Sequence, residues 1–140
     1  MANMAAPTGA ARVLVIDDEP IVAEKLAIVF SNAGYETRAV QSAEATLALL
    51  ESEKWIPHFA MIDVHLPGMN GIDLAITLKT RYPEMRVTLL SGRAATADLL
   101  EEASHEGHSF DILAKPVHPT VLLGMASSFL GDRDQGTHDR

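Results

Sequence analysis

The chain has 140 residues, a net charge of −8 and a hydrophobic fraction of 47%, which indicate one globular domain with a buried core. An acidic chain is poorly suited to bind nucleic-acid phosphates, so we expect no direct nucleic-acid partner. Cysteine is absent, which excludes disulfides and fits a cytoplasmic location. No apolar run approaches the roughly 20 residues that span a bilayer, and the first residues lack the pattern of a signal peptide.

Short apolar runs and helical patterns alternate along the chain. Strands are expected at residues 13–16, 36–40, 59–62, 86–90 and 111–114. The first and third runs are continuously apolar, as in strands covered on both faces, whereas the second is polar enough for a sheet edge. Helices are expected from Pro20 to Asn32, from Ser42 through Leu50, from Gly71 to before Pro83, through Leu99–Ala103, and from Pro119 to Gly131.

This alternation of strand and helix predicts an α/β fold with a parallel sheet and helices on both faces. We expect residues 1–10 to be a flexible leader, 11–130 to form the domain, and 131–140 to be a polar tail. In the last helix we expect Val121 and Leu122, together with Met125 and Phe129, to face the core.

Four of the expected strands end on side chains that can take part in catalysis or bind a ligand. The first is followed by Asp17 and Asp18, the third by Asp63, the fourth by Ser91 and the fifth by Lys115. The carboxyl ends of parallel strands meet at one edge of a sheet, so these groups are expected to converge. A turn rich in proline and glycine follows the third strand and is expected to shape the loop beyond it.

Converging carboxylates repel one another unless a cation joins them, and Mg²⁺ (or Mn²⁺) prefers such oxygen ligands. We expect Asp18 and Asp63 to be direct metal ligands, and Asp17 to act through water or by placing the ion. Lys115 supplies a further positive charge and Ser91 a hydroxyl donor. Phosphoryl transfer requires in-line positioning and charge neutralisation, so we predict that Asp63 is a nucleophile that forms an acyl phosphate.

From about Arg12 to Leu130 the chain resembles the receiver domains of two-component response regulators. The resemblance rests on four motifs in this order: Ile16-Asp17-Asp18-Glu19, Asp63-Val-His-Leu-Pro-Gly-Met-Asn-Gly71, Ser91-Gly92 and Lys115-Pro116. It implies a flavodoxin-like, doubly wound, five-stranded parallel sheet in the order 2-1-3-4-5 with five helices.

The resemblance also implies a single-domain, chemotaxis-type receiver that a histidine kinase or histidine phosphotransferase phosphorylates on Asp63. Mg²⁺ would be held by Asp18, Asp63 and the backbone carbonyl of His65, and the Lys115–Pro116 bond would be cis. The signal would leave through the face of the fourth helix, fifth strand and fifth helix. It would pass to a downstream protein, to a second copy in a homodimer, or onward to a phosphotransferase.

The sequence departs from the family pattern at a few positions. Three residues before the site lysine, where the family usually has an aromatic switch residue, stands Ile112; Phe110 lies two residues earlier. His65 and Arg93 occupy positions that tune dephosphorylation in the family. We therefore expect intact phosphorylation chemistry, altered coupling from Ser91 to Ile112, and a phosphoryl lifetime set by His65 and Arg93.

Three other functions compete with this interpretation. A phosphatase with an aspartyl nucleophile usually has a second acid two residues later, where this chain has His65, so we expect no enzymatic turnover beyond self-phosphorylation and dephosphorylation. A pseudo-receiver that works by protein contacts alone is favoured only by Ile112. A flavin-binding relative is disfavoured because the acidic loop after the first strand would repel a flavin phosphate.

Overall fold

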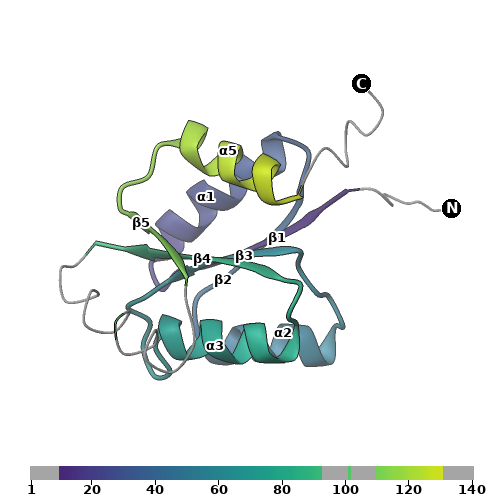
Figure 1. Ribbon diagram of the computed structural model, residues 1–140, viewed down its shortest axis with the longest axis vertical. Coiled ribbons are helices and arrows are strands. Elements are labelled where there is room, and N and C mark those ends of the chain that lie inside the picture. Colours follow the sequence, from purple (N-terminus) through teal and green to yellow (C-terminus); the bar gives the residue numbers. More distant parts are fainter. Residues whose placement is uncertain (1–9, 93–100, 102–109, 131–140) are drawn as a thin grey trace, which may run out of the picture.

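The computed structural model describes residues 10–92, 101 and 110–130. Five parallel strands form one sheet in the order β2-β1-β3-β4-β5, which confirms the predicted fold class and strand order. The elements are β1 (Arg12–Ile16), α1 (Pro20–Asn32), β2 (Glu36–Val40), α2 (Ala43–Ser52), β3 (Phe59–Asp63), α3 (Gly71–Arg81), β4 (Arg86–Ser91), β5 (Asp111–Ala114) and α5 (Pro119–Leu130). Helices α1 and α5 cover one face of the sheet, and α2 and α3 cover the other (Figure 1).

Of the five predicted helices, the fourth falls, except for residue 101, on residues outside the described ranges. Most of the predicted leader and the whole predicted tail also lie outside them. The helix labels therefore pass from α3 to α5. No helix in the described ranges is both long enough and apolar enough to cross a membrane.

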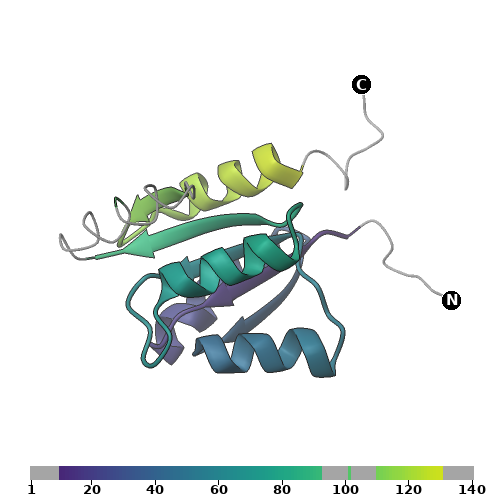
Figure 2. The ribbon, with the colours of Figure 1, turned by 60° about the horizontal axis from the view of Figure 1, so that its bottom comes forward.

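The central strand β3 is buried at all five positions. Phe59 and Met61 belong to the core on the side of α1 and α5, whereas Ala60 and Ile62 belong to the core on the side of α2 and α3. Figure 2 shows the sheet between these two helical layers. Side chains alternate between the faces of a strand, so a strand covered on both faces must be apolar throughout. This explains the continuous run that predicted β3.

Polar side chains fix where two of the helices begin. The Ser42 hydroxyl accepts a hydrogen bond from the backbone N–H of Ala45 at 3.0 Å and caps α2. The Asn70 side chain accepts one from the backbone N–H of Asp73 at 2.9 Å and caps α3. Such caps satisfy N–H groups that have no partner within the first turn of a helix.

Two of the residues of α5 that were predicted to face the core, Val121 and Met125, do not join it, and Met125 is half-buried and lines a surface hollow. Leu122, Ala126 and Leu130 are buried, whereas Val121 is 46% exposed. The buried residues follow one another at intervals of four and form a single stripe along the helix. Val121 lies about 100° around the helix from Leu122 and therefore falls outside this stripe. Two adjacent apolar residues do not show by themselves which of them faces the core.

Replacing Thr88 by valine is expected to stabilise the fold by about 1 kcal/mol, because a buried hydroxyl without a partner keeps its desolvation cost. Thr88 is fully buried in β4, and its hydroxyl has no hydrogen-bond partner among the described residues. Urea denaturation measures the change. Thr46 is a matched control, since it is equally buried but donates its hydroxyl to the Ser42 carbonyl at 2.9 Å. Thr46→Val is expected to lower the free energy of unfolding by about 1 kcal/mol. Equal changes in the free energy of unfolding of both variants would contradict this account.

Candidate functional site

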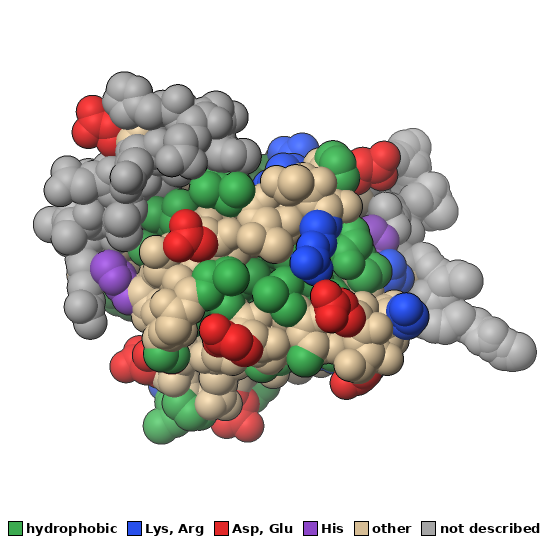
Figure 3. All heavy atoms as spheres, turned by 90° about the horizontal axis from the view of Figure 1, so that it is seen from below, with side chains coloured by type: hydrophobic (Ala, Val, Ile, Leu, Met, Phe, Trp, Pro, Cys, Tyr) green, Lys and Arg blue, Asp and Glu red, His purple; other side chains and the backbone are tan. Residues whose placement is uncertain are grey.

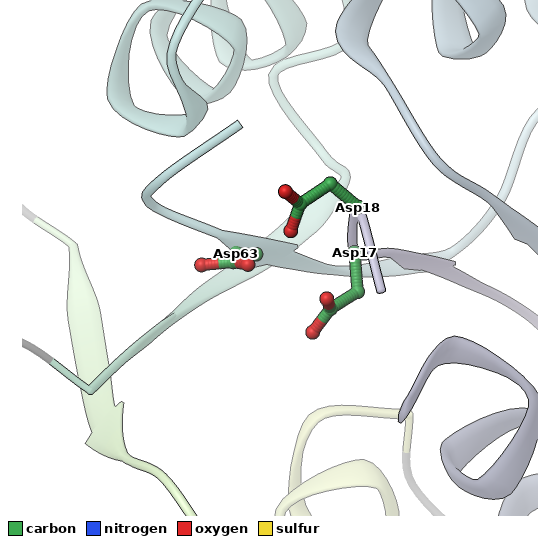
Figure 4. Close-up of side chains that lie close together, drawn as sticks. All are labelled: Asp17, Asp18 and Asp63. Atoms are coloured by element: carbon green, nitrogen blue, oxygen red, sulfur yellow. The ribbon is translucent and has the colours of Figure 1, made fainter. Parts of the chain in front are cut away.

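Three aspartates lie together at the edge of the sheet where β1 and β3 end (Figure 4). Asp17 and Asp18 directly follow β1, and Asp63 is the last residue of β3. One carboxylate oxygen from each residue lies within 4.8 Å of those of the other two. Asp17 is fully buried and Asp63 is 5% exposed, whereas Asp18 is exposed. The predicted convergence of these three acids is therefore confirmed.

Lys115 joins this cluster from the fifth strand. Its Nζ donates hydrogen bonds to Asp17 Oδ2 at 2.8 Å and to Asp63 Oδ2 at 3.2 Å. Its backbone N–H donates to the carbonyl of Ser91 at 2.9 Å, which ties the end of β5 to the end of β4. The Lys115–Pro116 peptide bond is cis, as the resemblance implied. One cation is thus shared between two buried carboxylates.

Backbone N–H groups hold both buried carboxylates in place. Asp17 Oδ1 accepts from the N–H of Glu19 at 2.9 Å, and Asp63 Oδ1 accepts from the N–H of His65 at 3.0 Å. In each case an aspartate bonds the backbone two residues further on, a local turn that aspartate readily forms. These bonds limit the rotation of both side chains. The sequence motif indicated the acids but not this anchoring.

Gly71 holds the loop after Asp63 against the end of the strand. Its N–H donates to the carbonyl of Val64 at 2.9 Å. A Cβ atom at this position would lie 2.1 Å from the carbonyl oxygen of Asp63 and 2.8 Å from Val64 Cα, so the position requires glycine. Gly68, in the same loop, has a φ of 71°, which also favours glycine. The predicted role of this turn is confirmed in its geometry.

The other residues that the sequence predicted for the site do not all lie beside the aspartates. A cavity of about 230 Å³ opens beside the acids, and His65 lines it. Ser91 is 6% exposed at the end of β4, where it pairs with Ala114 of β5. Ile112 pairs with Leu89 and is 38% exposed. Arg93 lies outside the described residues. Glu19 and Gly92, which belong to the sequence motifs but were given no role in the site, also line the cavity.

Burial raises the pKa of Asp63 above its ordinary value of 3.8. The His65 N–H and the charge of Lys115 act in the opposite direction, but the charge of Asp17 adds to the effect of burial. Burial alone would lower the pKa of Lys115, yet the hydrogen bond to Asp17 and the charges of both aspartates raise it. Lys115 therefore stays charged. Its charge does not fully offset the cost of burying a negative charge on Asp63, whose pKa remains raised.

The donor set fits a hard divalent cation. The three acids offer carboxylate oxygens, which Mg²⁺ prefers, and their combined negative charge exceeds the single positive charge of Lys115. Asp17 is fully buried and is not among the residues that line the cavity. Its two oxygens accept hydrogen bonds from Glu19 and Lys115, as those of Asp63 do from His65 and Lys115. Asp18 is the exposed acid and Asp63 borders the cavity with it. This arrangement agrees with direct ligation by Asp18 and Asp63 and an indirect role for Asp17.

In metal-free buffer, the stability of the wild type relative to Asp63→Asn is expected to fall as the pH rises above about 4. The pKa of Asp63 is higher in the folded chain than in the unfolded chain. Between these two pKa values the folded state holds a proton that the unfolded state has lost, so raising the pH weakens folding. The asparagine variant has no such proton. Urea denaturation of both proteins with a chelator, over a series of pH values, measures the difference, and a constant difference would contradict the raised pKa.

Sequence comparison finds relatives along most of the chain. The family model described as the response regulator receiver domain matches residues 13–127. Response regulator protein FleR of Pseudomonas aeruginosa is 36% identical over 118 residues, which cover 84% of this chain and 24% of FleR. DNA-binding response regulator MtrA of Mycolicibacterium smegmatis is 31% identical over 112 residues, which cover 80% of this chain and 47% of MtrA. The chain therefore spans less than half the length of either relative.

Solved structures show the same fold. A CheY-like receiver domain protein from Methanospirillum hungatei superimposes with a TM-score of 0.77 at 23% identity, covering 91% of this chain and 99% of that one. The receiver domain of NtrX from Brucella abortus gives a TM-score of 0.72 at 28% identity, covering 86% of this chain and 98% of that one. The aspartate cluster thus lies on a scaffold shared with these proteins.

Proposed function

The chain belongs to the response regulator receiver family, and from this membership we propose that it is a switch operated by phosphorylation of Asp63. The observation that supports the proposal most strongly is the site itself. Three carboxylates lie within 4.8 Å of one another, and Lys115 bonds the two that are buried. This arrangement combines a nucleophile, a cation site and a fixed positive charge, as phosphoryl transfer requires.

In the proposed reaction an Asp63 carboxylate oxygen attacks the phosphorus of the donor. A P–O bond forms at Asp63 while the bond to the leaving group breaks, so that an acyl phosphate replaces the carboxylate. The donor is a phosphohistidine of a histidine kinase or phosphotransferase, whose imidazole leaves with the bonding electron pair. Lys115, already 3.2 Å from Asp63, would stabilise negative charge on the transferred group, and the Ser91 hydroxyl would donate to one of its oxygens.

When bound, Mg²⁺ (or Mn²⁺) would neutralise phosphoryl charge in the transition state. We propose Asp18, Asp63 and the backbone carbonyl of His65 as its ligands. The position of Asp17 is fixed by Glu19 and Lys115, and it would place the ion without ligating it directly.

We further propose that the signal leaves through the face formed by β5 and α5. On this face Ile112 is 38% exposed and Val121 is 46% exposed, beside a hollow of about 550 Å³ that Leu113 and Met125 also line. Apolar side chains that stay exposed are suited to a protein partner, whether a downstream protein or a second copy. Three further properties remain predictions. They are that the protein acts as a single-domain receiver, that it is located in the cytoplasm, and that it has no enzymatic turnover.

The proposed function is tested by incubating the protein with acetyl phosphate, with Mg²⁺ or with a chelator, and recording intact mass. We expect the mass to increase by one phosphoryl group only when Mg²⁺ is present, and hydroxylamine to remove that group because it cleaves acyl phosphates. If neither acetyl phosphate nor a panel of histidine kinases labels the chain, it is a pseudo-receiver and the proposal is wrong. Turnover of a phosphomonoester would instead indicate a phosphatase.

Replacing His65 by alanine is expected to shorten the half-life of the acyl phosphate several-fold. The imidazole lines the cavity beside Asp63, so it limits the room for an attacking water molecule. The decay of purified phosphoprotein, followed by intact mass after removal of the donor, measures the half-life. His118→Ala is the control, since His118 is exposed and does not line this cavity. An unchanged half-life in His65→Ala would show that this side chain does not control water access.

A further inference from the structure

A second cavity, of about 630 Å³, lies at the end of the molecule opposite the aspartate cluster. Arg12 and Arg86, which are the first residues of β1 and β4, line it. Asp63 and Ser91 are by contrast the last residues of their strands. The strands are parallel, so the cavity and the phosphoacceptor site lie at opposite edges of the sheet. β1 begins and α5 ends at this end of the molecule (Figure 1).

Positive charge gathers around this cavity. Three arginines line it, Arg12, Arg81 and Arg86, against one acidic residue, Glu84, among the described residues of the lining. Arg81 pairs with Glu51 at 3.2 Å, but within the described ranges neither Arg12 nor Arg86 has an ion-pair partner. The chain has 19 acidic and 11 basic residues, so a cavity lined by more basic than acidic side chains is a local exception. On the face formed by α2 and α3, most of the visible Lys and Arg side chains lie in the half toward this end, with Asp and Glu side chains among them (Figure 3).

Neutral neighbours hold both of these arginines in place. Arg12 Nε donates to the carbonyl of Ile56 at 2.7 Å. The guanidinium carbon of Arg86 lies 4.5 Å from the centre of the Phe129 ring. Neither contact neutralises the guanidinium charge. A planar guanidinium that is already positioned can bind phosphate oxygens in a bidentate manner and loses little further freedom on binding.

The rest of the lining is mainly apolar. Ile56 and Phe129 are half-buried and Pro83 is exposed, so these residues present apolar surface, whereas Pro57, Met85 and Leu130 are buried and present little. Tyr82 adds a partly buried aromatic ring. The volume lies within the range of about 300–1,000 Å³ that is usual for small-molecule sites. A bare inorganic anion would leave this apolar surface without a partner, whereas an organic phosphate with a planar ring would contact both parts of the cavity.

We propose that this cavity binds a nucleoside monophosphate. The phosphate contacts the guanidinium groups of Arg12 and Arg86, and the base packs against Tyr82 and the apolar lining. Such a ligand would give the domain a second input, separate from Asp63.

The test is calorimetric titration of the full chain with each of the four ribonucleoside monophosphates, up to about 1 mM at constant ionic strength. At least one of them is expected to bind saturably. Arg86→Gln is expected to weaken that binding about tenfold, the loss of one charge-assisted contact. The matching nucleoside without phosphate should not bind, and inorganic phosphate should bind more weakly than the nucleotide.

Arg38→Gln is the matched control. Arg38 also lies over an aromatic ring, with its guanidinium carbon 5.0 Å from the centre of the Trp55 ring, but it is outside the cavity. It should leave the affinity unchanged, as should Asp63→Asn. Arg86 is exposed, so its variant should fold, which circular dichroism checks. The proposal is overturned if none of the four nucleotides binds, if the nucleoside binds equally well, or if both arginine variants lose affinity alike.

Discussion

Asp63→Asn is expected to abolish labelling of the chain by acetyl phosphate. An amide oxygen is a much weaker nucleophile than a carboxylate and offers no negative charge to a divalent cation. The variant side chain has nearly the same shape, and its oxygen can still accept the N–H of His65 that now bonds Asp63 at 3.0 Å. The loss of labelling would therefore come from lost chemistry and not from a collapsed loop. Intact-mass spectra after incubation with acetyl phosphate and Mg²⁺ give the measurement.

Two controls separate this loss of chemistry from a loss of structure. Asp73 is an exposed aspartate in the first turn of α3, away from the cluster, and Asp73→Asn should be labelled like the wild type. Without metal, Asp63→Asn should also be at least as stable as the wild type near neutral pH, because burial raises the pKa of Asp63 and makes its charge costly. Full labelling of Asp63→Asn would mean that another residue is the phosphoacceptor.

Gly71→Ala is expected to lower the free energy of unfolding by at least about 3 kcal/mol, at the upper end of single-residue effects. The new Cβ atom would lie 2.1 Å from the carbonyl oxygen of Asp63 and 2.8 Å from Val64 Cα. These are backbone atoms, so relief requires moving either the start of α3 or the end of β3. The same shift would displace Asp63, so the variant should also be labelled more slowly under conditions in which it remains folded.

Gly124→Ala is the matched control for this substitution. Gly124 lies inside α5, and nothing lies within 4 Å of the position that its Cβ would occupy. Alanine is favoured over glycine in a helix by about 0.5–1 kcal/mol, so this variant should gain stability. Urea denaturation compares the two variants. A Gly71→Ala protein as stable as the wild type would contradict the close packing described for the loop.

The strands could be predicted from sequence because their environment is simple. β2 and β5 have the predicted bounds, and β3 differs only by including Asp63 as its last residue. β3 is covered by helices on both faces and is apolar up to Asp63, so its burial leaves a direct mark on the sequence, whereas β2 and β5 are the more exposed edge strands. The inward face of α5 was less certain, because the adjacent residues Val121 and Leu122 are both apolar and only one of them is buried.

The acids of the site could also be predicted, because each follows an apolar run and parallel strands place such positions at one edge. The sequence did not show how those acids are held. Lys115 lies 98 residues from Asp17, yet its Nζ donates to that carboxylate at 2.8 Å. The cavity around Arg12 and Arg86 was missed as well. The one signal for it is that each arginine comes directly before an apolar run.

The sequence by itself determined the fold class, the strand order through family resemblance, and the identity of the four charged side chains that meet at the sheet edge, Asp17, Asp18, Asp63 and Lys115. These properties depend on local apolar patterns and on residue type. Only the tertiary structure decided that one lysine is shared between two buried aspartates, that burial raises the pKa of Asp63, and that Gly71 must lack a Cβ. Charge sharing, desolvation and close backbone approach depend on distances between segments far apart in the chain, and residue order alone does not specify those distances.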